Sequence, residues 1–351
     1  MEKTTVAILF GGRSPEYSVS LESASGVIRS LDRDRFTPVL IGISREGGWY
    51  RYTGPEEAIG EDRWQDEPGW CTPAVVSPDP AARALLVLRP DRIERVALDA
   101  AFPVLHGRNG EDGTVQGVFA LAGIPVVGCG VLASALCMDK DRAHRLAAAA
   151  GVRVPHSYTL RQGFDPAELE EHARRVGYPL FVKPVRAGSS YGISRVERKR
   201  ALLSAVAEAF QYDDTVLIEE AIPGFEVGCA VMGSGADLTV GVPDEIELSQ
   251  GFFDFTEKYG LITSQIHVPA RITAEQVQRV QETAKRIYRA LDCSGFARVD
   301  MFLTPGDTIV FNEVNTIPGF TPHSRFPSMM QAVGVSFREV LTRAIEQAVR
   351  A

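Results

Sequence analysis

The chain has 351 residues, of which 45% are hydrophobic and 23% charged, a composition typical of a globular protein with more than one domain. Its net charge of −8 argues against a nucleic-acid surface and against a basic face that binds membranes. The sequence has no apolar run of the roughly 20 residues that span a bilayer, and its five scattered cysteines form no CxxC pair. We therefore expect a cytoplasmic protein with reduced thiols that binds neither nucleic acid nor a membrane.

The first third of the chain alternates predicted strands and helices. An apolar run at 6–10 ends in two glycines and precedes a helical pattern at about 19–31, which is the strand–turn–helix order of an α/β protein. The stretch between 45 and 95 is rich in Pro, Gly, Trp and charge, and we expect short hairpins and loops there. Further buried strands are predicted at 39–43, 98–105 and 124–127. These elements predict an open-sheet domain over residues 1–128.

Helix signals are clear in the rest of the chain. Asp139 is expected to cap a helix that ends at Gly151, and Asp165-Pro166 to begin another that ends at Gly177. Capping-box sequences at 273–276 and 336–339 predict the starts of two more helices. Strands are predicted at 180–183, 215–219 and 226–231.

Two strand-like runs near the C-terminus, 296–302 and 309–315, carry polar groups at alternate positions. Side chains two residues apart on a strand share a face, so Glu313 and Asn315 point the same way and Asp300 can join them from the neighbouring strand. Three oxygen ligands suit Mg²⁺, which binds one or two carboxylates together with substrate phosphates. The pattern therefore predicts ATP-dependent phosphoryl chemistry; the alternative is a pair of amphipathic strands with solvated outer faces.

Two further segments have features of a nucleotide site. A strand ends in Lys183, and a Gly-Ser-Ser-Tyr-Gly turn follows at 188–192, where backbone N–H groups can form a nest for phosphate beside a compact positive charge. The alternative is a hairpin turn with a surface lysine. Glu219 and Glu226 flank a short connection that can offer groups to adenine and ribose, although they can equally be two acids at strand ends.

Three more segments are candidates for the reaction itself. His106 follows a buried strand, and in the loop after residue 315 the Gly319 N–H and Arg298 can stabilise an oxyanion while Ser324 holds a substrate carboxylate. The aromatic loop at 251–259 is a candidate lid. The alternatives are a structural histidine, an ordinary Pro/Gly loop and a solvent loop packed by its own aromatics.

Taken together and in this order, the motifs resemble the D-alanine–D-alanine ligase family of the ATP-grasp superfamily over nearly the full chain. The motifs that carry the resemblance lie at 11–16, 105–113, 137–140, 183–192, 298–300 and 312–320. The resemblance implies an α/β protein with an ATP-grasp fold. Its expected parts are an N-terminal substrate-binding domain at 1–128, a central subdomain at 129–219, and a C-terminal subdomain at 220–351 with the Mg²⁺ site and lid.

The resemblance also implies a reaction. The carboxylate of a first D-alanine attacks the γ-phosphate of ATP to give an acyl phosphate, and the amine of a second D-amino acid attacks the acyl group. The products are a dipeptide for peptidoglycan precursors, ADP and phosphate. The implied cofactors are ATP and two Mg²⁺ ions, with Mn²⁺ as a substitute. The implied partners are D-alanine, D-serine and a second copy of the chain in a homodimer.

The family's functional residues transfer to matching positions of this sequence. Catalytic or substrate-binding roles are implied for Glu16, His106, Ser189, Tyr259, Arg298, Gly319 and Ser324. Nucleotide-binding roles are implied for Lys140, Lys183, Ser190, Glu219, Glu220, Ile222, Glu226, Lys258 and Asn312. The implied metal ligands are Asp300, Glu313 and Asn315.

Departures from the common pattern concern the second substrate. Arg325 stands where many D-alanine–D-alanine ligases have an apolar or shorter residue. At this position the sequence resembles the ligases of vancomycin resistance. The lid sequence with Lys258 and Tyr259 lacks the histidine of the D-lactate-using members, and the loop around Phe252 is similar to that of D-alanine–D-serine ligases. We therefore expect D-serine or D-alanine as the acceptor, with Phe252 and Arg325 as specificity residues.

Other functions remain as alternatives. They are a D-alanine–D-lactate depsipeptide ligase, another ATP-grasp carboxylate–amine ligase, and a nucleotide-binding regulator. A pure regulator would not need the complete metal set of Asp300, Glu313 and Asn315. A dehydrogenase is disfavoured because the Gly11-Gly12 turn lacks the GxGxxG spacing.

Overall fold

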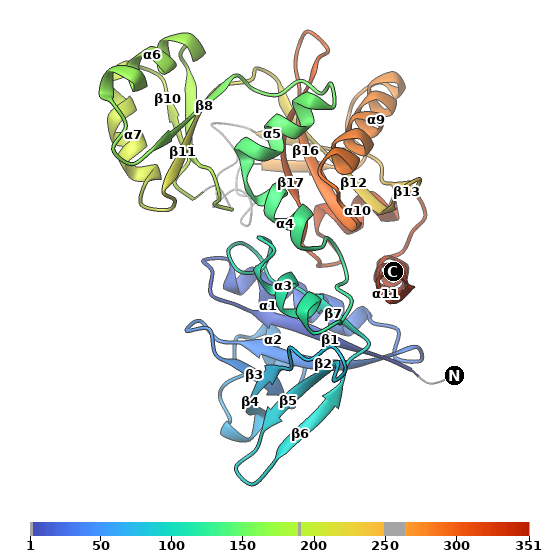
Figure 1. Cartoon of the computed structure of the whole chain (residues 1–351). Helices are drawn as coiled ribbons and strands as arrows, with labels where there is room; N and C mark the ends of the chain where they lie inside the picture. The colour runs from blue at the N-terminus through green and yellow to red at the C-terminus, as the bar shows by residue number, and fades with distance from the viewer. Residues whose placement is uncertain (1–2, 189–190, 249–263, 351) are drawn as a thin grey trace.

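The computed structural model describes residues 3–188, 191–248 and 264–350. Three β-sheets follow one another along the chain, and the first lies at one end of the molecule while the other two lie side by side at the opposite end (Figure 1). All five cysteines are free thiols, and four of them are buried. Within the described ranges, no helix combines the length and apolar character needed to cross a membrane.

The first sheet has seven strands in the order β6-β5-β4-β3-β2-β1-β7, and β1 pairs in parallel with both β2 and β7. The strands are β1 (Thr4–Gly11), β2 (Phe36–Ile43), β3 (Trp49–Tyr52), β4 (Cys71–Val76), β5 (Ala84–Leu88), β6 (Ile93–Ala97) and β7 (Ala100–Pro103). The predicted hairpin and loop region at 45–95 thus supplies four antiparallel strands that widen the sheet. The strand predicted at 124–127 is wrong: only an isolated bridge joins Ala101 and Val126.

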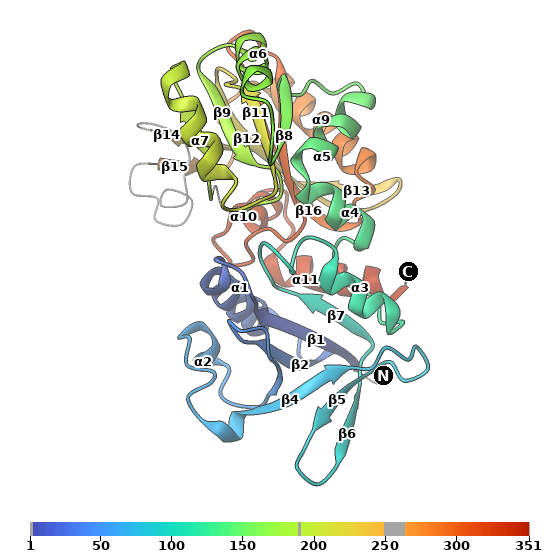
Figure 2. The ribbon, with the colours of Figure 1, turned by 60° about the vertical axis from the view of Figure 1, so that its left-hand side comes forward.

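Short helical segments connect or cover these strands. They are α1 (Tyr17–Ser30), α2 (Glu57–Gly60), η1 (Pro68–Trp70) and α3 (Thr114–Leu121). Helix α1 buries one side, including Leu21, Val27 and Ile28, against the first sheet. Helix α1 lies at the end of the first sheet that is nearer the other two sheets (Figure 2), and Glu16 directly precedes it.

The second sheet has four strands in the order β10-β9-β11-β8 and a core of its own with helices α6 and α7. Its elements are β8 (Ser157–Arg161), α6 (Pro166–Val176), β9 (Leu180–Pro184), β10 (Ser194–Val196), η2 (Lys199–Ala201), α7 (Leu202–Ala209) and β11 (Thr215–Glu220). The predicted start of α6 is confirmed, because the Asp165 side chain accepts a hydrogen bond from the Ala167 N–H and Pro166 occupies the first turn.

The third sheet follows the order β15-β14-β12-β16-β17, with β13 also paired to β12. Its strands are β12 (Phe225–Ser234), β13 (Asp237–Val240), β14 (Asp244–Leu248), β15 (Ser264–His267), β16 (Gly295–Leu303) and β17 (Ile309–Asn315). The remaining helices are α4 (Val131–Met138), α5 (Lys140–Ala149), α9 (Ala274–Ala290), α10 (Arg325–Gln331) and α11 (Phe337–Arg350). The predicted caps of α5 and α9 at Asp139 and Thr273 are confirmed.

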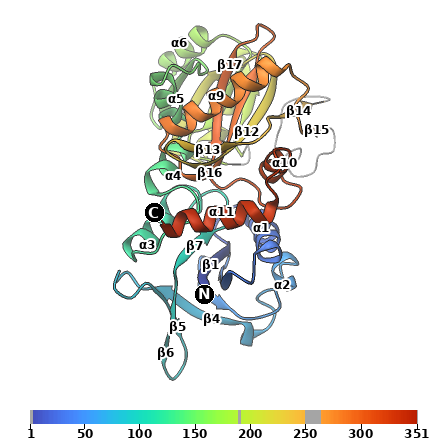
Figure 3. The same ribbon diagram turned by 90° about the vertical axis from the view of Figure 1, so that its right-hand side faces the viewer.

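The C-terminal helices join the first and third sheets. Helix α11 lies between these sheets (Figure 3), and its apolar side belongs to the same core as β1 and α1. The ring centroid of Phe320 lies 5.7 Å from that of Phe102 on β7 and 4.8 Å from that of Phe296 on β16. Residues 129–152, including α4 and α5, pack against the third sheet rather than the second. The domain boundaries after 128 and 219 stay a prediction.

Candidate active site

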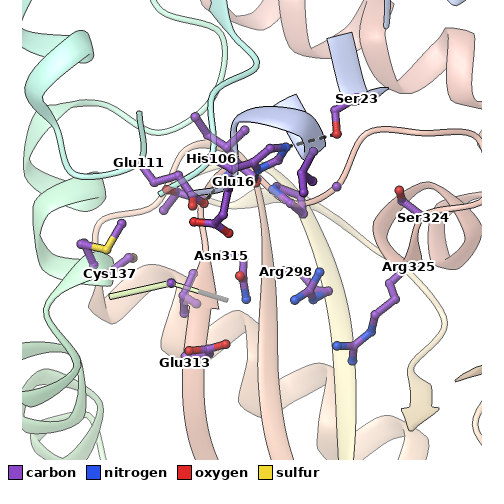
Figure 4. Close-up of a pocket in the computed structure, with 18 of the residues that line it drawn as sticks. Glu16, Ser23, His106, Glu111, Cys137, Arg298, Glu313, Asn315, Ser324 and Arg325 are labelled. Atoms are coloured by element: carbon purple, nitrogen blue, oxygen red, sulfur yellow. Dashed lines mark hydrogen bonds between the residues drawn. The ribbon is translucent and has the colours of Figure 1, made fainter. Parts of the chain in front are cut away.

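A cavity of about 320 Å³ opens where the three sheets meet (Figure 4). Its walls come from the start of α1, the turn after β7, the start of α5, the glycine loop after β9, and β16 and β17 with the loop that follows. The predicted site residues that line it are Glu16, His106, Lys140, Arg298, Glu313, Asn315, Gly319, Ser324 and Arg325. The fold therefore gathers residues from distant parts of the chain into one space.

The other predicted site residues are not part of that lining. Within the described chain they are Lys183, Glu219, Glu220, Ile222, Glu226, Asp300 and Asn312. Ser189, Ser190, Phe252, Lys258 and Tyr259 lie outside the described residues, so the predicted lid contacts have no structural account here.

The predicted metal ligands meet through the pairing of β16 with β17. Asp300 is the register partner of Glu313, and the Asn315 Nδ2 donates a 2.8 Å hydrogen bond to Asp300 Oδ2. Asp300 also accepts three hydrogen bonds from Arg298, at 2.8 Å, 3.1 Å and 2.7 Å. No cluster of three His, Cys, Asp or Glu side chains suited to a metal occurs among the residues that the structure describes.

The donor set nevertheless fits the predicted ion. Two carboxylates and one amide are hard oxygen donors, and Mg²⁺ commonly completes its octahedral shell with substrate phosphates and water rather than with protein side chains. Arg298 pairs with Asp300: burial lowers the pKa of Arg298, but the Asp300 carboxylate and other groups outweigh this, so that the pKa is raised. The role of Asp300, Glu313 and Asn315 as metal ligands stays a prediction.

A buried ion pair lies beside the cavity on the second sheet. Lys183 on β9 contacts Glu219 on the paired strand β11, and both side chains are buried. The second oxygen of Glu219, Oε2, is buried and has no hydrogen-bond partner in the described part of the chain. An unsatisfied buried acceptor costs free energy, so this oxygen suits a donor from a bound molecule such as a ribose hydroxyl.

Two neighbouring nucleotide-site candidates, Glu220 and Asn312, form hydrogen bonds with histidine residues of other segments. The Glu220 carboxylate accepts the His156 N–H at 3.0 Å, and the Asn312 carbonyl accepts a 2.8 Å hydrogen bond from His144 Nε2. Ile222 is half-buried in the connection between β11 and β12.

Lys140 joins the glycine loop to the metal-ligand strand. It is the first residue of α5, and its Nζ donates to the Ala187 carbonyl at 2.8 Å. The same Nζ lies 3.7 Å from Glu313 Oε2. A lysine in this position can neutralise a phosphate held between the loop and the carboxylate.

Glu16 and His106 form the N-terminal wall of the cavity. The Glu16 carboxylate lies between two glycines, because a Cβ at Gly107 or at Gly188 would collide with its Oε2. The backbone of the phosphate-loop candidate therefore approaches Glu16 closely. Burial lowers the pKa of His106, which keeps its ring neutral at neutral pH.

Glu111 is a buried acid of the cavity that the sequence prediction missed. It lies in the same turn as His106, where Gly107 and Gly113 adopt positive φ, and an acid in such a glycine-rich turn was a usable signal. Burial raises its pKa from 4.5 to about 8, helped by the charges of Glu16 and Glu313.

Arg325, expected as a specificity residue for the acceptor, is surrounded by carboxylates of the protein itself. Its Nε and Nη2 donate to both oxygens of Asp244 at 2.6 Å and 2.8 Å, and its Nη1 donates to Glu226 at 3.0 Å. Burial alone would lower the pKa of Arg325, but the carboxylates, Asp244 foremost, outweigh it and raise that pKa. Asp244 is a second residue that the sequence prediction missed, and Gly228 leaves the space in which this ion pair forms. A contact between Arg325 and the second substrate stays a prediction.

The sequence and fold were compared with those of known proteins. Family models described as the N-terminus and the C-terminus of D-Ala-D-Ala ligase match residues 5–129 and 146–346. A protein of Streptomyces coelicolor described as a putative D-alanine–D-lactate ligase is 46% identical, with 99% of this chain and 98% of that protein covered. A D-alanine–D-alanine ligase of Caldicellulosiruptor bescii is 40% identical, with coverage of 99% and 96%. The crystal structure of the VanG D-Ala:D-Ser ligase from Enterococcus faecalis superimposes with a TM-score of 0.92 at 53% identity, covering 99% of this chain and all of that one.

Proposed function

The chain belongs to the D-alanine–D-alanine ligase family of ATP-grasp enzymes, and we propose that it joins the carboxylate of D-alanine to the amine of D-serine or of a second D-alanine. Members of this family use ATP and Mg²⁺. The proposed product is a D-alanyl dipeptide for peptidoglycan precursors, formed through an acyl phosphate on the first D-alanine.

One observation carries this proposal. A single cavity is lined by Glu16, His106, Arg298 and Gly319 together with Lys140 and Glu313. Figure 4 shows Glu16, His106, Arg298 and Glu313 around it. An amino acid whose ammonium pairs with Glu16 can direct its carboxylate towards the cationic and metal-ligand side. Phosphoryl transfer needs mainly positioning and charge neutralisation, and these groups supply both.

The residues divide the work by charge. Lys140 and Lys183 neutralise the phosphates, while Glu219 accepts hydrogen bonds from the nucleoside. Asp300, Glu313 and Asn315 would hold the two proposed Mg²⁺ ions, which lower the charge repulsion between the phosphates and the attacking carboxylate. In the second step, Arg298 and the Gly319 N–H stabilise the oxygen of the tetrahedral intermediate.

The acceptor proposed is an amino acid, with D-serine as the leading choice. Support comes from the 53% identity to a D-Ala:D-Ser ligase and from Arg325, which brings a cation and two acids to the acceptor side. A polar wall distinguishes a hydroxymethyl from a methyl group only where it hydrogen-bonds the hydroxyl; a pocket that merely has room discriminates by about 100-fold or less. Use of both D-serine and D-alanine therefore fits the proposal.

D-lactate is the second candidate acceptor. It is favoured by the 46% identity to a protein described as a putative D-alanine–D-lactate ligase. The lid sequence of this chain carries Lys258 and Tyr259 without a histidine, which supports an amino acid as the acceptor instead.

Product analysis separates these candidates. The protein is incubated with ATP, Mg²⁺ and D-alanine, together with equal concentrations of D-serine and D-lactate, and the products are identified by mass. We expect D-alanyl-D-serine and D-alanyl-D-alanine. Absence of phosphate release with D-alanine would overturn the ligase proposal, and formation of D-alanyl-D-lactate alone would overturn the amino-acid acceptor.

The quaternary state is part of the same proposal. A homodimer follows the family's habit, and sedimentation equilibrium measures it directly. A monomer at all concentrations used in the assay would contradict it without affecting the proposed reaction.

A further inference from the structure

The loop at residues 316–320 is held by side chains of the N-terminal sheet region. The Ile317 N–H, the Ile317 carbonyl and the Phe320 N–H each bind a different side chain from that region. This loop begins directly after Asn315 and contains Gly319, so it carries the proposed oxyanion donor. Its backbone is thus fixed by residues that precede it in the chain by more than 200 positions.

Glu111 makes the central contact of this arrangement. Its Oε1 accepts the Ile317 N–H at 3.2 Å, and its Oε2 accepts the Gly107 N–H at 2.8 Å. An ionised carboxylate only accepts hydrogen bonds, so one side chain satisfies a donor from its own turn and a donor from the distant loop. Figure 4 shows Glu111 next to His106 and Glu16 at this wall of the cavity.

His106 and Ser23 complete the arrangement from the other side. A carbonyl only accepts, so His106 Nδ1 carries the proton and donates to the Ile317 carbonyl at 3.0 Å. Its Nε2 then accepts from the Ser23 hydroxyl at 3.1 Å, and the Ser23 oxygen accepts the Phe320 N–H at 3.3 Å. The backbone of Ile317 is therefore held at both its N–H and its C=O.

On the premise of the proposed ligase reaction, we propose that Glu111 is a positioning residue that holds the Ile317 peptide and thereby directs the Gly319 N–H at the oxyanion of the tetrahedral intermediate. Gly319 lies between two residues whose backbone groups are anchored, so its own N–H direction depends on both anchors. On the other side, a Cβ at Gly319 would lie 2.9 Å from Ser324 Oγ, which leaves the loop little room to shift.

The expected size of the effect follows from what the loop carries. Loss of one oxyanion donor lowers turnover by roughly 10²–10³-fold, and a misplacement of about 1 Å has a similar cost. The oxyanion forms only when the amine attacks the acyl group. Phosphoryl transfer to the first D-alanine passes through no tetrahedral carbon, so a positioning role for Glu111 affects the second step selectively.

The test uses the full-length Glu111→Gln variant at a pH above 8, where the wild-type carboxyl is ionised. The variant keeps the side-chain volume but replaces one acceptor by an NH₂ donor that faces a backbone N–H. Positional isotope exchange in ¹⁸O-labelled ATP, at a D-alanine concentration that fills only the donor subsite, reports the first step. Dipeptide formation reports the second. We expect dipeptide formation to fall about 100-fold and isotope exchange to change less than about threefold.

Asp112→Asn is the matched control. The Asp112 carboxylate accepts hydrogen bonds from the N–H groups of Asn109 and Thr114 in the same turn. Among the described residues, these hydrogen bonds do not involve the loop at 316–320. The Asp112→Asn variant should leave both isotope exchange and dipeptide formation unchanged. Ser23→Ala, which loosens the Phe320 anchor instead, should give the same selective loss in smaller measure. Equal loss of both steps in Glu111→Gln would make its role merely structural and would overturn the proposal, as would no loss in either step.

A second readout separates this inference from the ligase assignment. Hydrogen exchange of the peptide covering 316–320 should speed up in Glu111→Gln and not in Asp112→Asn, whatever the reaction is. Unchanged exchange would overturn the positioning role even in an active ligase. A wild-type protein without ligase activity would overturn the proposed function and, with it, the link to the oxyanion.

Discussion

The second sheet and the N-terminal wall of the cavity use buried carboxylates in opposite ways. On the second sheet, Glu219 pairs with Lys183 and keeps one buried oxygen without a partner among the described residues. At the N-terminal wall, both oxygens of Glu111 accept backbone hydrogen bonds. An unsatisfied acceptor costs free energy until a ligand satisfies it, whereas a satisfied one fixes the backbone around it. The carboxylate on the second sheet thus keeps one acceptor for a possible ligand, whereas the carboxylate at the N-terminal wall fixes the backbone.

The largest effect is expected from Glu313→Gln on β17. The change removes a charge next to Lys140 and, if the metal assignment is correct, a Mg²⁺ ligand. Turnover should fall by about 10³-fold or more, the size associated with losing a charge-neutralising group in phosphoryl transfer. ADP release as a function of Mg²⁺ concentration measures it, with the exposed Glu282→Gln as control. A variant of near-normal activity would refute the metal assignment.

The Arg325 ion pair tests the holding principle at another buried carboxylate, Asp244. Arg325→Met leaves the Asp244 carboxylate buried without its guanidinium, and removal of one partner of a buried pair costs about 3–5 kcal/mol. Urea denaturation measures the loss. The double variant Arg325→Met/Asp244→Asn removes the stranded charge as well, so most of the stability should return. A double variant no more stable than the single one would show that the pair contributes through packing alone.

Local signals and long-range pairings explain what the sequence could predict. The caps at Asp165 and Thr273 depend on residues two or three positions away, and they were found. Asp300, Glu313 and Asn315 were brought together by strand alternation, which is also local. Glu111 and Asp244 were missed because their partners are 206 and 81 positions distant, and no spacing rule reveals such a partner.

The first sheet was underestimated for the same reason. Its outer strands β3 to β6 hold few continuous apolar runs, and they become strands by pairing with β2 and with one another. Strand preference depends on the neighbours that a segment finds as much as on its own sequence. The placement of α11 between two sheets likewise follows from apolar partners on β7 and α1 rather than from its own pattern.

A smaller effect on activity should follow Glu219→Gln on the second sheet. The amide can still accept one hydrogen bond but loses the charge, and a hydrogen bond to a charged group contributes about 1.5–3 kcal/mol. The KM for ATP should therefore rise by roughly 10- to 100-fold, with a smaller change in kcat. Steady-state kinetics with varied ATP measures both, and the exposed Glu168→Gln on α6 serves as control. An unchanged KM would mean that the unpartnered oxygen faces no nucleotide.

A further effect is expected in the pH dependence of stability, and it concerns Glu111. Its folded-state pKa is raised from 4.5 to about 8 by burial and by the facing charges of Glu16 and Glu313. Between these values the unfolded chain releases a proton that the folded protein keeps, so the free energy of unfolding falls as the pH rises. The contribution is fully present below pH 4.5 and is lost once the pH has passed 8.

Urea denaturation of the wild type and of Glu111→Gln over this pH range isolates that contribution, because all other titrating groups, His106 included, are common to both proteins. The wild type should lose stability relative to the variant as the pH rises, and the two should be closest at low pH. Parallel curves would place the Glu111 pKa near its ordinary value. In that case the Glu111 carboxylate would hold the Ile317 N–H at all pH values of the assay. Glu111 and Glu219 would then differ in their hydrogen-bond partners but not in their charge.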